Sequence, residues 1–161
     1  MTTRALAILL LAATAWPAPS VARTTGTPSK AFVAQQFQIW NAALQTGDPQ
    51  RVAALYCATG AVLIPTVSNT LRTSRAEIAD YFQHFLAMRP EGEIDTAYIR
   101  ILDPTTAIDS GIYTFHLVKD HKPEDVQARY TFVYRKVNGT WCIIEHHSSA
   151  MPETGRAVQE R

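Results

Sequence analysis

The chain has little of what marks several large classes of protein. Of its 161 residues, 15 are lysine or arginine and 14 are aspartate or glutamate, and neither sign gathers into a long run. This balance argues against nucleic acid and against anionic membranes as partners. Only two cysteines are present, and no Cys-X-X-Cys pair or Cys/His spacing typical of a metal site occurs. No internal repeat or low-complexity segment is found, which argues against repeat architectures.

The N-terminal segment has the composition of a secretory signal peptide. Arg4 precedes an apolar run over residues 5–15, and residues 20–22 place small side chains where a signal peptidase cleaves. The run is too short to cross a bilayer, which takes about 20 residues. We therefore predict export to the periplasm or beyond, with no membrane partner after cleavage. The predicted organisation is a signal peptide at 1–22, a linker at 23–30, one domain at 31–153 and a polar tail at 154–161.

Export bears on the state of Cys57 and Cys142. An oxidising compartment permits a disulfide between them. Their apolar neighbours suit buried thiols equally well, and the sequence leaves both alternatives open.

The first half of the domain has helical patterns. Apolar residues recur at helical spacing between Val33 and Leu44, and proline follows Thr27 at a helix start. Ser74 and Glu77 form a capping box for a later helix. The predicted elements are helices at 28–45, from Asp48–Pro49 onward and at 75–88, a short strand at 61–64 ended by Pro65, and a polar loop at 66–73.

The second half has strand patterns. Segments near 94–102, 106–118, 126–137 and 139–149 are rich in β-branched and aromatic residues, and Asn138-Gly139 is a strong hairpin signal. Helices followed by antiparallel strands predict an α+β fold, with the helices packed on one face of a curved sheet. Such a sheet wraps into a cone whose open end is a natural pocket.

Four polar side chains end the last predicted strand: His146, His147, Ser148 and Ser149. Imidazoles and hydroxyls donate, accept and relay protons, so this strand end is a candidate wall of a reaction pocket. Strict alternation places Cys142, Ile144, His146 and Ser148 on one face, and Trp141, Ile143, Glu145, His147 and Ser149 on the other. Because adjacent histidines then diverge, the pattern argues against a zinc site with three converging ligands.

Other hydroxyl groups are candidates for the same pocket. Tyr113 and Tyr130 lie on neighbouring predicted strands and place phenols near the rim. Tyr81 lies on the inner face of the third helix, and Thr66 follows the strand-ending Pro65.

Five segments resemble the iota-class carbonic anhydrases, relatives of the association domain of calcium/calmodulin-dependent protein kinase II on the nuclear transport factor 2-like cone fold. The resemblance covers residues 31–153 and is most specific at the His-His-Ser-Ser-X-Met-Pro ending. The segments are 61–69 (AVLIPTVSN), 81–86 (YFQHFL), 90–92 (PEG), 129–134 (RYTFVY) and 146–153 (HHSSAMPE).

The resemblance implies reversible hydration of carbon dioxide to bicarbonate in a pocket active without metal, with zinc or manganese as the alternative cofactor. Carried over by motif, the catalytic hydroxyls are Thr66, Tyr81 and Ser148, with Ser149 as the alternative serine. The kinase-association relatives have a pocket arginine at the position of Ser148. A histidine with an ordinary pKa near ~6.5, His146 or His147, would relay the proton. Tyr113, Tyr130, His147 and Ser149 are the expected substrate-binding residues.

Two other functions remain open. Domains of this fold also bind small ligands or assemble without catalysis, and we expect a homodimer through an outer sheet face that carries Trp141 and Ile143. An isomerase or dehydratase would need an inward Asp-His pair, and by helical phase Asp80 and His84 face solvent.

Overall fold

The computed structural model describes residues 26–152. The predicted signal peptide and polar tail, and the first part of the predicted linker, lie outside the described residues. Within residues 26–152 no helix is long and apolar enough to cross a membrane. The elements are α1 (Lys30–Gln45), α2 (Pro49–Ala53), β1 (Val62–Ile64), α3 (Arg75–Phe85), the 3-10 helix η1 (Leu86–Met88), β2 (Glu91–Asp103), β3 (Thr106–Lys119), β4 (Lys122–Val137) and β5 (Thr140–Ala150).

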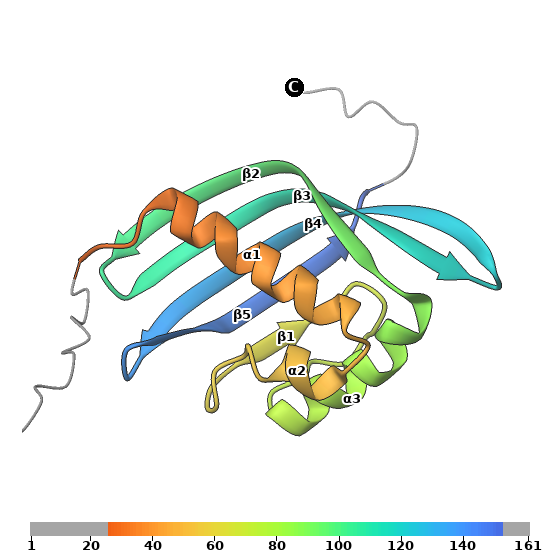
Figure 1. Ribbon diagram of the computed structural model, residues 1–161, viewed down its shortest axis with the longest axis horizontal. Coiled ribbons are helices and arrows are strands. Elements are labelled where there is room, and N and C mark those ends of the chain that lie inside the picture. Colours follow the sequence, from red (N-terminus) through yellow and green to blue (C-terminus); the bar gives the residue numbers. More distant parts are fainter. Residues whose placement is uncertain (1–25, 153–161) are drawn as a thin grey trace, which may run out of the picture.

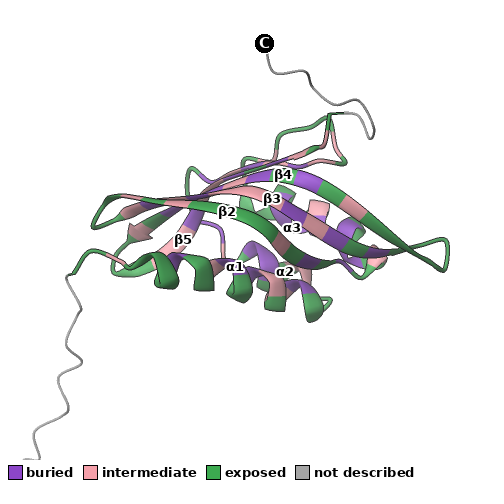
Figure 2. Cartoon of the chain, turned by 90° about the horizontal axis from the view of Figure 1, so that it is seen from above, coloured by how far each residue is buried: buried purple, intermediate pink, exposed green. Residues whose placement is uncertain are grey.

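The predicted α+β fold is confirmed. The five strands form one sheet in the order β1-β5-β4-β3-β2, in which β2 to β5 are antiparallel neighbours and β1 runs parallel to β5. Helix α1 crosses one face of this sheet, and α2 and α3 lie beside β1 (Figure 1). Buried residues concentrate on the surfaces where helices and sheet face each other (Figure 2).

Local capping signals fix the helix ends. The predicted start of α1 at Thr27–Pro28 is wrong, because Ser29 is the N-cap and its hydroxyl accepts a hydrogen bond from the Phe32 amide at 3.1 Å. Asp48 caps α2, and the capping box of Ser74 and Glu77 opens α3 as predicted. The third helix changes to a 3-10 turn at Leu86 and ends at Arg89, which has a left-handed φ of 48°.

The sheet is bent where β2 meets β3. A β-bulge shifts the register between Ile94 and Thr96, and Gly111 on β3 pairs with Ala97, directly after the bulge. A Cβ at Gly111 would come within 1.8 Å of the Thr96 carbonyl oxygen, so only glycine allows this close approach. Bulge and glycine together curve the sheet around its helix-covered face.

Strands β3 and β4 extend further than predicted. The segment expected to separate them, residues 120–124, is reduced to a turn at Asp120 and His121, both with positive φ. Strand β2 pairs with β3 only as far as His116, so the rest of the hairpin projects beyond the sheet (Figure 1). At the other end, Asn138 and Gly139 have positive φ and close the predicted tight hairpin.

A second bulge changes which residues of β5 face the core. Val133 pairs with Glu145 and Tyr134 with Ile143, so Ile144 is an extra residue on β5. Strict alternation is therefore wrong at this point: Ile143, 2% exposed, is in the core. Trp141 packs on Phe32 of α1 with ring centroids 5.7 Å apart. Trp141 and Ile143 therefore do not form the exposed outer face of the sheet that the sequence had predicted.

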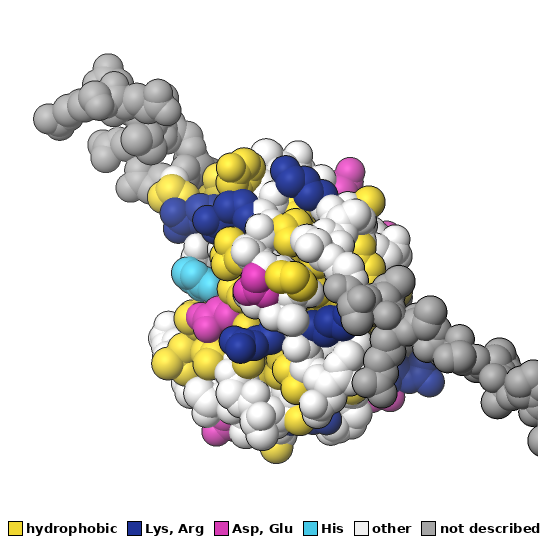
Figure 3. Space-filling model, turned by 90° about the vertical axis from the view of Figure 1, so that its left-hand side faces the viewer, with side chains coloured by type: hydrophobic (Ala, Val, Ile, Leu, Met, Phe, Trp, Pro, Cys, Tyr) yellow, Lys and Arg dark blue, Asp and Glu magenta, His cyan; other side chains and the backbone are white. Residues whose placement is uncertain are grey.

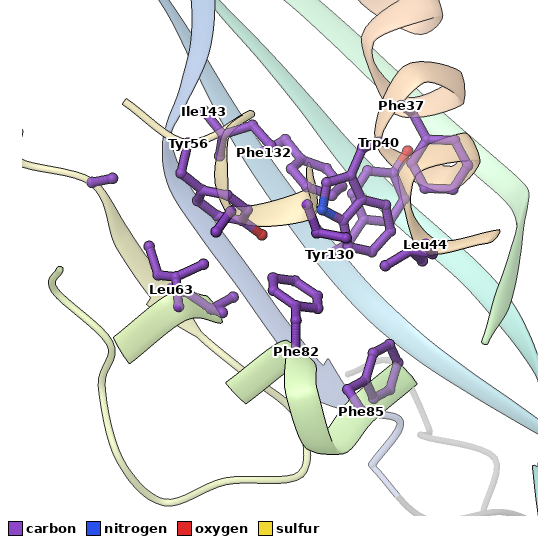
Figure 4. Packing of buried hydrophobic residues seen from close by; sticks show 14 of the residues in the cluster. Phe37, Trp40, Leu44, Tyr56, Leu63, Phe82, Phe85, Tyr130, Phe132 and Ile143 are labelled. Carbon is purple, nitrogen blue, oxygen red and sulfur yellow. The ribbon is translucent and has the colours of Figure 1, made fainter. Parts of the chain in front are cut away.

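Aromatic side chains fill the core between α1, α3 and the sheet (Figure 4). Trp40 lies at its centre, with edge-on ring contacts to Phe82, Phe132 and His146 at 5.3–6.2 Å. Aromatic pairs in these geometries contribute about 0.5–1.5 kcal/mol each beyond the area that they bury.

The two cysteines form a disulfide, which answers the question that the sequence left open. The bond joins the segment after α2 to the start of β5. Beside it, the Cys57 amide donates to the Ile143 carbonyl, and the Ile143 amide donates to the Leu55 carbonyl, both at 2.9 Å. Residues 55–57 are thereby held along β5, and Tyr56 between them points into the core (Figure 4).

Candidate functional site

A cavity of about 120 Å³ lies between the concave face of the sheet and the helices. Its walls come from α1, β1 and the loop after it, α3, η1, the projecting β3–β4 hairpin and β5. Val67, Lys119 and Glu124 are the exposed lining residues, and they mark where the cavity meets solvent. The lining residues are Trp40, Leu63, Pro65, Thr66, Val67, Tyr81, Phe82, Phe85, Met88, Tyr113, Phe115, Leu117, Lys119, Glu124, Val126, Ala128, His146 and Ser148.

Three hydroxyl groups meet at one wall of this cavity. The Tyr113 hydroxyl donates a hydrogen bond to Ser148 Oγ at 2.6 Å, and Ser148 Oγ is in a short hydrogen bond with Thr66 Oγ1. We call Thr66, Tyr113 and Ser148 the hydroxyl trio. Burial raises the pKa of Tyr113, so its phenol stays protonated and acts as a donor.

The parallel pairing of β1 with β5 brings Thr66 to Ser148. Leu63 pairs with His146 and Ile64 with His147, so the two strands run in the same direction toward the cavity. Pro65 ends the strand, and Thr66 then lies beside Ser148. Ser149 points to the other side of β5, which decides between the two alternative serines in favour of Ser148 as the cavity residue.

A small residue lets Tyr113 reach Ser148 across an intervening strand. Tyr113 on β3 pairs with Ala128 on β4, which pairs in turn with Ala150 on β5. Ala128 is buried and lines the cavity, and its methyl group leaves room for the phenol to pass over β4. Ala128 is not among the residues predicted from the sequence, because its importance depends on its two neighbours across the sheet.

His146 lines the cavity but does not have the ordinary pKa expected of a relay. The ring is stacked on Phe132 with centroids 4.0 Å apart, and its Nδ1 lies 2.8 Å from the Tyr56 hydroxyl. Burial, with a smaller contribution from His147, lowers the pKa of His146 to about 3. The imidazole is therefore neutral at pH 7, which corrects the expectation of a histidine that charges and discharges near neutrality.

Tyr81 reaches the cavity from α3, as expected from its helical phase. Burial raises its pKa, partly opposed by Arg72. Its ring stacks on Phe85 with centroids 5.8 Å apart, and its hydroxyl makes no hydrogen bond to another described residue. This hydroxyl is separate from the trio and is available to a guest.

The structure does not bring three of the expected substrate-binding residues to the cavity. Tyr130 donates a hydrogen bond to the buried carboxylate of Asp109 at 3.0 Å, away from the cavity lining. His147 and Ser149 lie with Arg129 in a shallow hollow on the outer face of β4 and β5. Tyr113 alone of the four expected residues lines the cavity.

The inner part of the cavity carries no charge. Its polar side chains are the hydroxyl-bearing residues, Trp40 with its indole N–H and the neutral His146, and the charged lining residues, Lys119 and Glu124, are exposed at the mouth. Within residues 26–152 no group of three or more His, Cys, Asp or Glu side chains is placed to hold a metal ion. The cavity offers one histidine, with Nδ1 engaged by Tyr56, which does not fit the ligand set of a catalytic zinc.

The calcium/calmodulin dependent protein kinase II association domain family matches residues 29–152 of the chain. A crystal structure from Xanthomonas campestris that carries the same association-domain description is 53% identical, with a TM-score of 0.76, and the match covers 79% of this chain and 91% of that one. A nuclear transport factor 2-like superfamily protein from Salmonella enterica is 18% identical over 82% of this chain and 96% of its own length, with a TM-score of 0.67. A Caulobacter vibrioides protein with a cystatin-like fold is also 18% identical, covering 74% and 87%, with a TM-score of 0.62. No curated protein matches the chain.

Proposed function

The chain belongs to the calcium/calmodulin dependent protein kinase II association domain family, and we propose that within it this protein is a carbonic anhydrase of the iota class. The proposed reaction is the reversible hydration of carbon dioxide to bicarbonate, without metal. The observation that carries the proposal is the hydroxyl trio at the wall of a cavity whose inner part is uncharged. Tyr81 adds a fourth hydroxyl from α3.

A count of protons shows what the trio offers a substrate. Three hydroxyls carry three protons, and the two hydrogen bonds within the trio use two of them. Because Tyr113 donates to Ser148, the remaining proton belongs to Thr66 or Ser148. The trio therefore presents one free donor and hydroxyl lone pairs at the same point of the cavity, so that it can accept one proton and give another.

This arrangement supports a concerted proton relay. A water hydrogen-bonded to the lone pair of Thr66 or Ser148 attacks the carbon of carbon dioxide, and one C=O π pair moves to its oxygen. The water proton passes to the trio, and the trio's free proton, on Thr66 or Ser148, passes to that carbonate oxygen. Where the accepting and the donating hydroxyl are different residues, the proton between Thr66 and Ser148 shifts from the first to the second. The product is carbonic acid, the trio is unchanged, and no charged base is needed.

The neutral cavity suits such a relay. An anion buried without a partner is costly, and the described lining places its cation, Lys119, at the mouth. Carbonic acid is released neutral and loses its proton in solution, giving bicarbonate. The histidine relay is unnecessary in this scheme, and His146 instead serves as a neutral wall of the cavity.

Removing the relaying hydroxyls tests the proposal. In stopped-flow hydration after exhaustive chelation, we expect Ser148→Ala and Thr66→Val each to lower kcat/KM by about 10²-fold, the lower range for a positioned proton-transfer group. Ser149→Ala is the matched control, because it removes a neighbouring hydroxyl from the outer face, and it should leave the rate unchanged. A wild-type chain that does not accelerate hydration would leave a ligand-binding or assembly domain as the better account.

The pH dependence of the same reaction adds an independent check. The pKa of His146 is lowered to about 3 and burial raises those of Tyr81 and Tyr113, so none of these groups titrates near neutrality. We expect kcat/KM for hydration to vary by no more than about twofold between pH 6 and pH 9. A steep rise with an inflection near pH 7, or activity only after adding zinc or manganese, would instead indicate a metal-bound hydroxide.

We also propose export to the periplasm or beyond, because the N-terminal segment has the composition of a secretory signal peptide.

We further propose that the protein is a homodimer. The outer sheet face supports the dimer, since Tyr98 on β2 is 66% exposed and Ile108 and Ile112 on β3 are partly exposed beside it. Figure 3 shows a different side of the molecule, at the left of the view in Figure 1, where hydrophobic side chains and charged side chains of both signs are interspersed. Sedimentation velocity should give a dimer for the wild type and a monomer for Tyr98→Glu; a monomeric wild type would refute this interface.

A further inference from the structure

The cavity is larger and more apolar than hydration of carbon dioxide requires. Its volume of about 120 Å³ equals that of roughly four water molecules, whereas the reaction needs one water and one triatomic molecule. Phe82, Phe85, Phe115, Leu117 and Val126 form apolar parts of its wall. In another protein, an apolar cavity of about 150 Å³ binds benzene. This cavity is thus close to the size that holds one aromatic ring.

The polar end of the cavity matches a hydroxyl group in particular. The trio has one free proton, on Thr66 or Ser148, and Thr66 keeps a free lone pair whichever of these two residues is the donor. A guest hydroxyl both donates and accepts, and so satisfies both, whereas an ether or ketone oxygen satisfies only the proton. Ser148 is 7% exposed, so a hydrogen bond formed there is shielded from water.

The charge of the cavity decides between neutral and anionic guests. A carboxylate at the trio would find hydroxyls and the neutral His146 but no cation, because Lys119 lies at the mouth and is accompanied by Glu124. Burying an unpaired carboxylate is unfavourable. The cavity therefore selects neutral compounds.

We propose that this cavity is a binding site for a small neutral alcohol or phenol, with the hydroxyl on Thr66 and Ser148 and the apolar body against Phe85, Phe115 and Val126. The site is independent of whether the protein hydrates carbon dioxide, because it depends only on the shape, charge and hydrogen bonding of the cavity. Where hydration occurs, such a compound competes with it.

Three probes with a single aromatic ring test the proposal: phenol, fluorobenzene and the larger benzoate, titrated at pH 7 and followed by amide NMR shifts of the residues that line the cavity. Phenol has the hydroxyl, fluorobenzene has the same number of heavy atoms without it, and benzoate is an anion. We expect saturable binding of phenol, about tenfold weaker binding of fluorobenzene, as one hydrogen bond provides, and weaker binding still of benzoate.

Two variants separate the polar end from the apolar body of the site. Ser148→Ala should weaken phenol about tenfold and leave fluorobenzene unchanged, while Val126→Phe should weaken both at least tenfold by filling the cavity. Benzoate binding as tightly as phenol, equal phenol affinity in all three proteins, or no saturable shift up to the solubility limit of phenol would overturn the proposal. If Val126→Phe fails to fold, the comparison of phenol with fluorobenzene in wild type and Ser148→Ala remains decisive. Because no probe is a substrate of hydration, these outcomes are distinct from failure of the hydration assay.

Discussion

Replacing both Cys57 and Cys142 with alanine should lower the free energy of unfolding by about 4 kcal/mol. The disulfide closes a loop with a sequence separation of 85 residues, and chain entropy assigns about 4–5 kcal/mol to a loop of this length, with measured values typically about 2–5 kcal/mol. Such a loss is a large part of the about 5–15 kcal/mol that stabilises an ordinary domain. The effect should be greatest where residues 55–57 run along β5, since two backbone hydrogen bonds, from the Cys57 amide to Ile143 and from the Ile143 amide to Leu55, join this segment to the strand.

Urea unfolding of the double variant measures this loss, and the wild type under reducing conditions is the matched control. Reductant should destabilise the wild type by a similar amount and leave the double variant unaffected. A loss below about 1 kcal/mol would show that packing of Tyr56 and its neighbours, rather than the disulfide, holds this segment.

Acidification should destabilise the protein through His146. Its pKa is about 3 in the folded protein, against about 6.5 in the unfolded chain, so the unfolded chain binds the proton more tightly. The stability that this difference provides is complete above about pH 6.5 and is lost as the pH falls toward 3. The loss attributable to this histidine should be about 3 kcal/mol between pH 7 and pH 4. The buried Asp109 acts in the opposite direction, because burial raises its pKa and its contribution falls as the pH rises.

His146→Gln isolates this term, because glutamine keeps a hydrogen-bonding side chain opposite Tyr56 and does not titrate. We expect the variant to be less stable than the wild type at pH 7, with the gap closing by about 3 kcal/mol by pH 4 in urea unfolding. Contributions from Asp109 and from His116, whose pKa is raised by Asp125 and Glu93, are common to both proteins and cancel. Parallel stability curves, or an imidazole NMR signal of His146 that titrates near pH 6, would contradict the prediction.

Patterns over a few residues predicted most of the secondary structure. The capping box of Ser74 and Glu77, the Asp48 cap and the Asn138-Gly139 hairpin are local hydrogen-bonding and dihedral preferences that need no distant partner. The start of α1 was missed because Pro28 and Ser29 are both acceptable beginnings, and the hydrogen bond of Ser29 to Phe32 decides between them. The projecting hairpin was missed because polar residues near its turn are as typical of a loop as of an exposed strand.

The candidate site was predicted only in part. Thr66, Tyr81, Tyr113, His146 and Ser148 do line one cavity, and strand alternation correctly separated His146 and Ser148 from their neighbours. Tyr130 has the same strand phase as residues that line the cavity, but its phenol is bonded to Asp109. A phase indicates a face of the sheet, and it does not say where along that face a long side chain ends.

The sequence by itself determined the α+β order, the N-terminal caps of α2 and α3, the tight hairpin and the phase of the hydroxyl-bearing strand end, because each follows from patterns of residues close together in the chain. Only the tertiary structure decided the parallel pairing of β1 with β5, the extra residue Ile144, the passage of Tyr113 over Ala128 and the contact of Tyr56 with His146. Each of these joins segments distant in sequence, where many registers have similar local patterns and only packing of the whole core selects one. The lowered pKa of His146 has the same origin, since burial is a property of the assembled fold and not of the residue type.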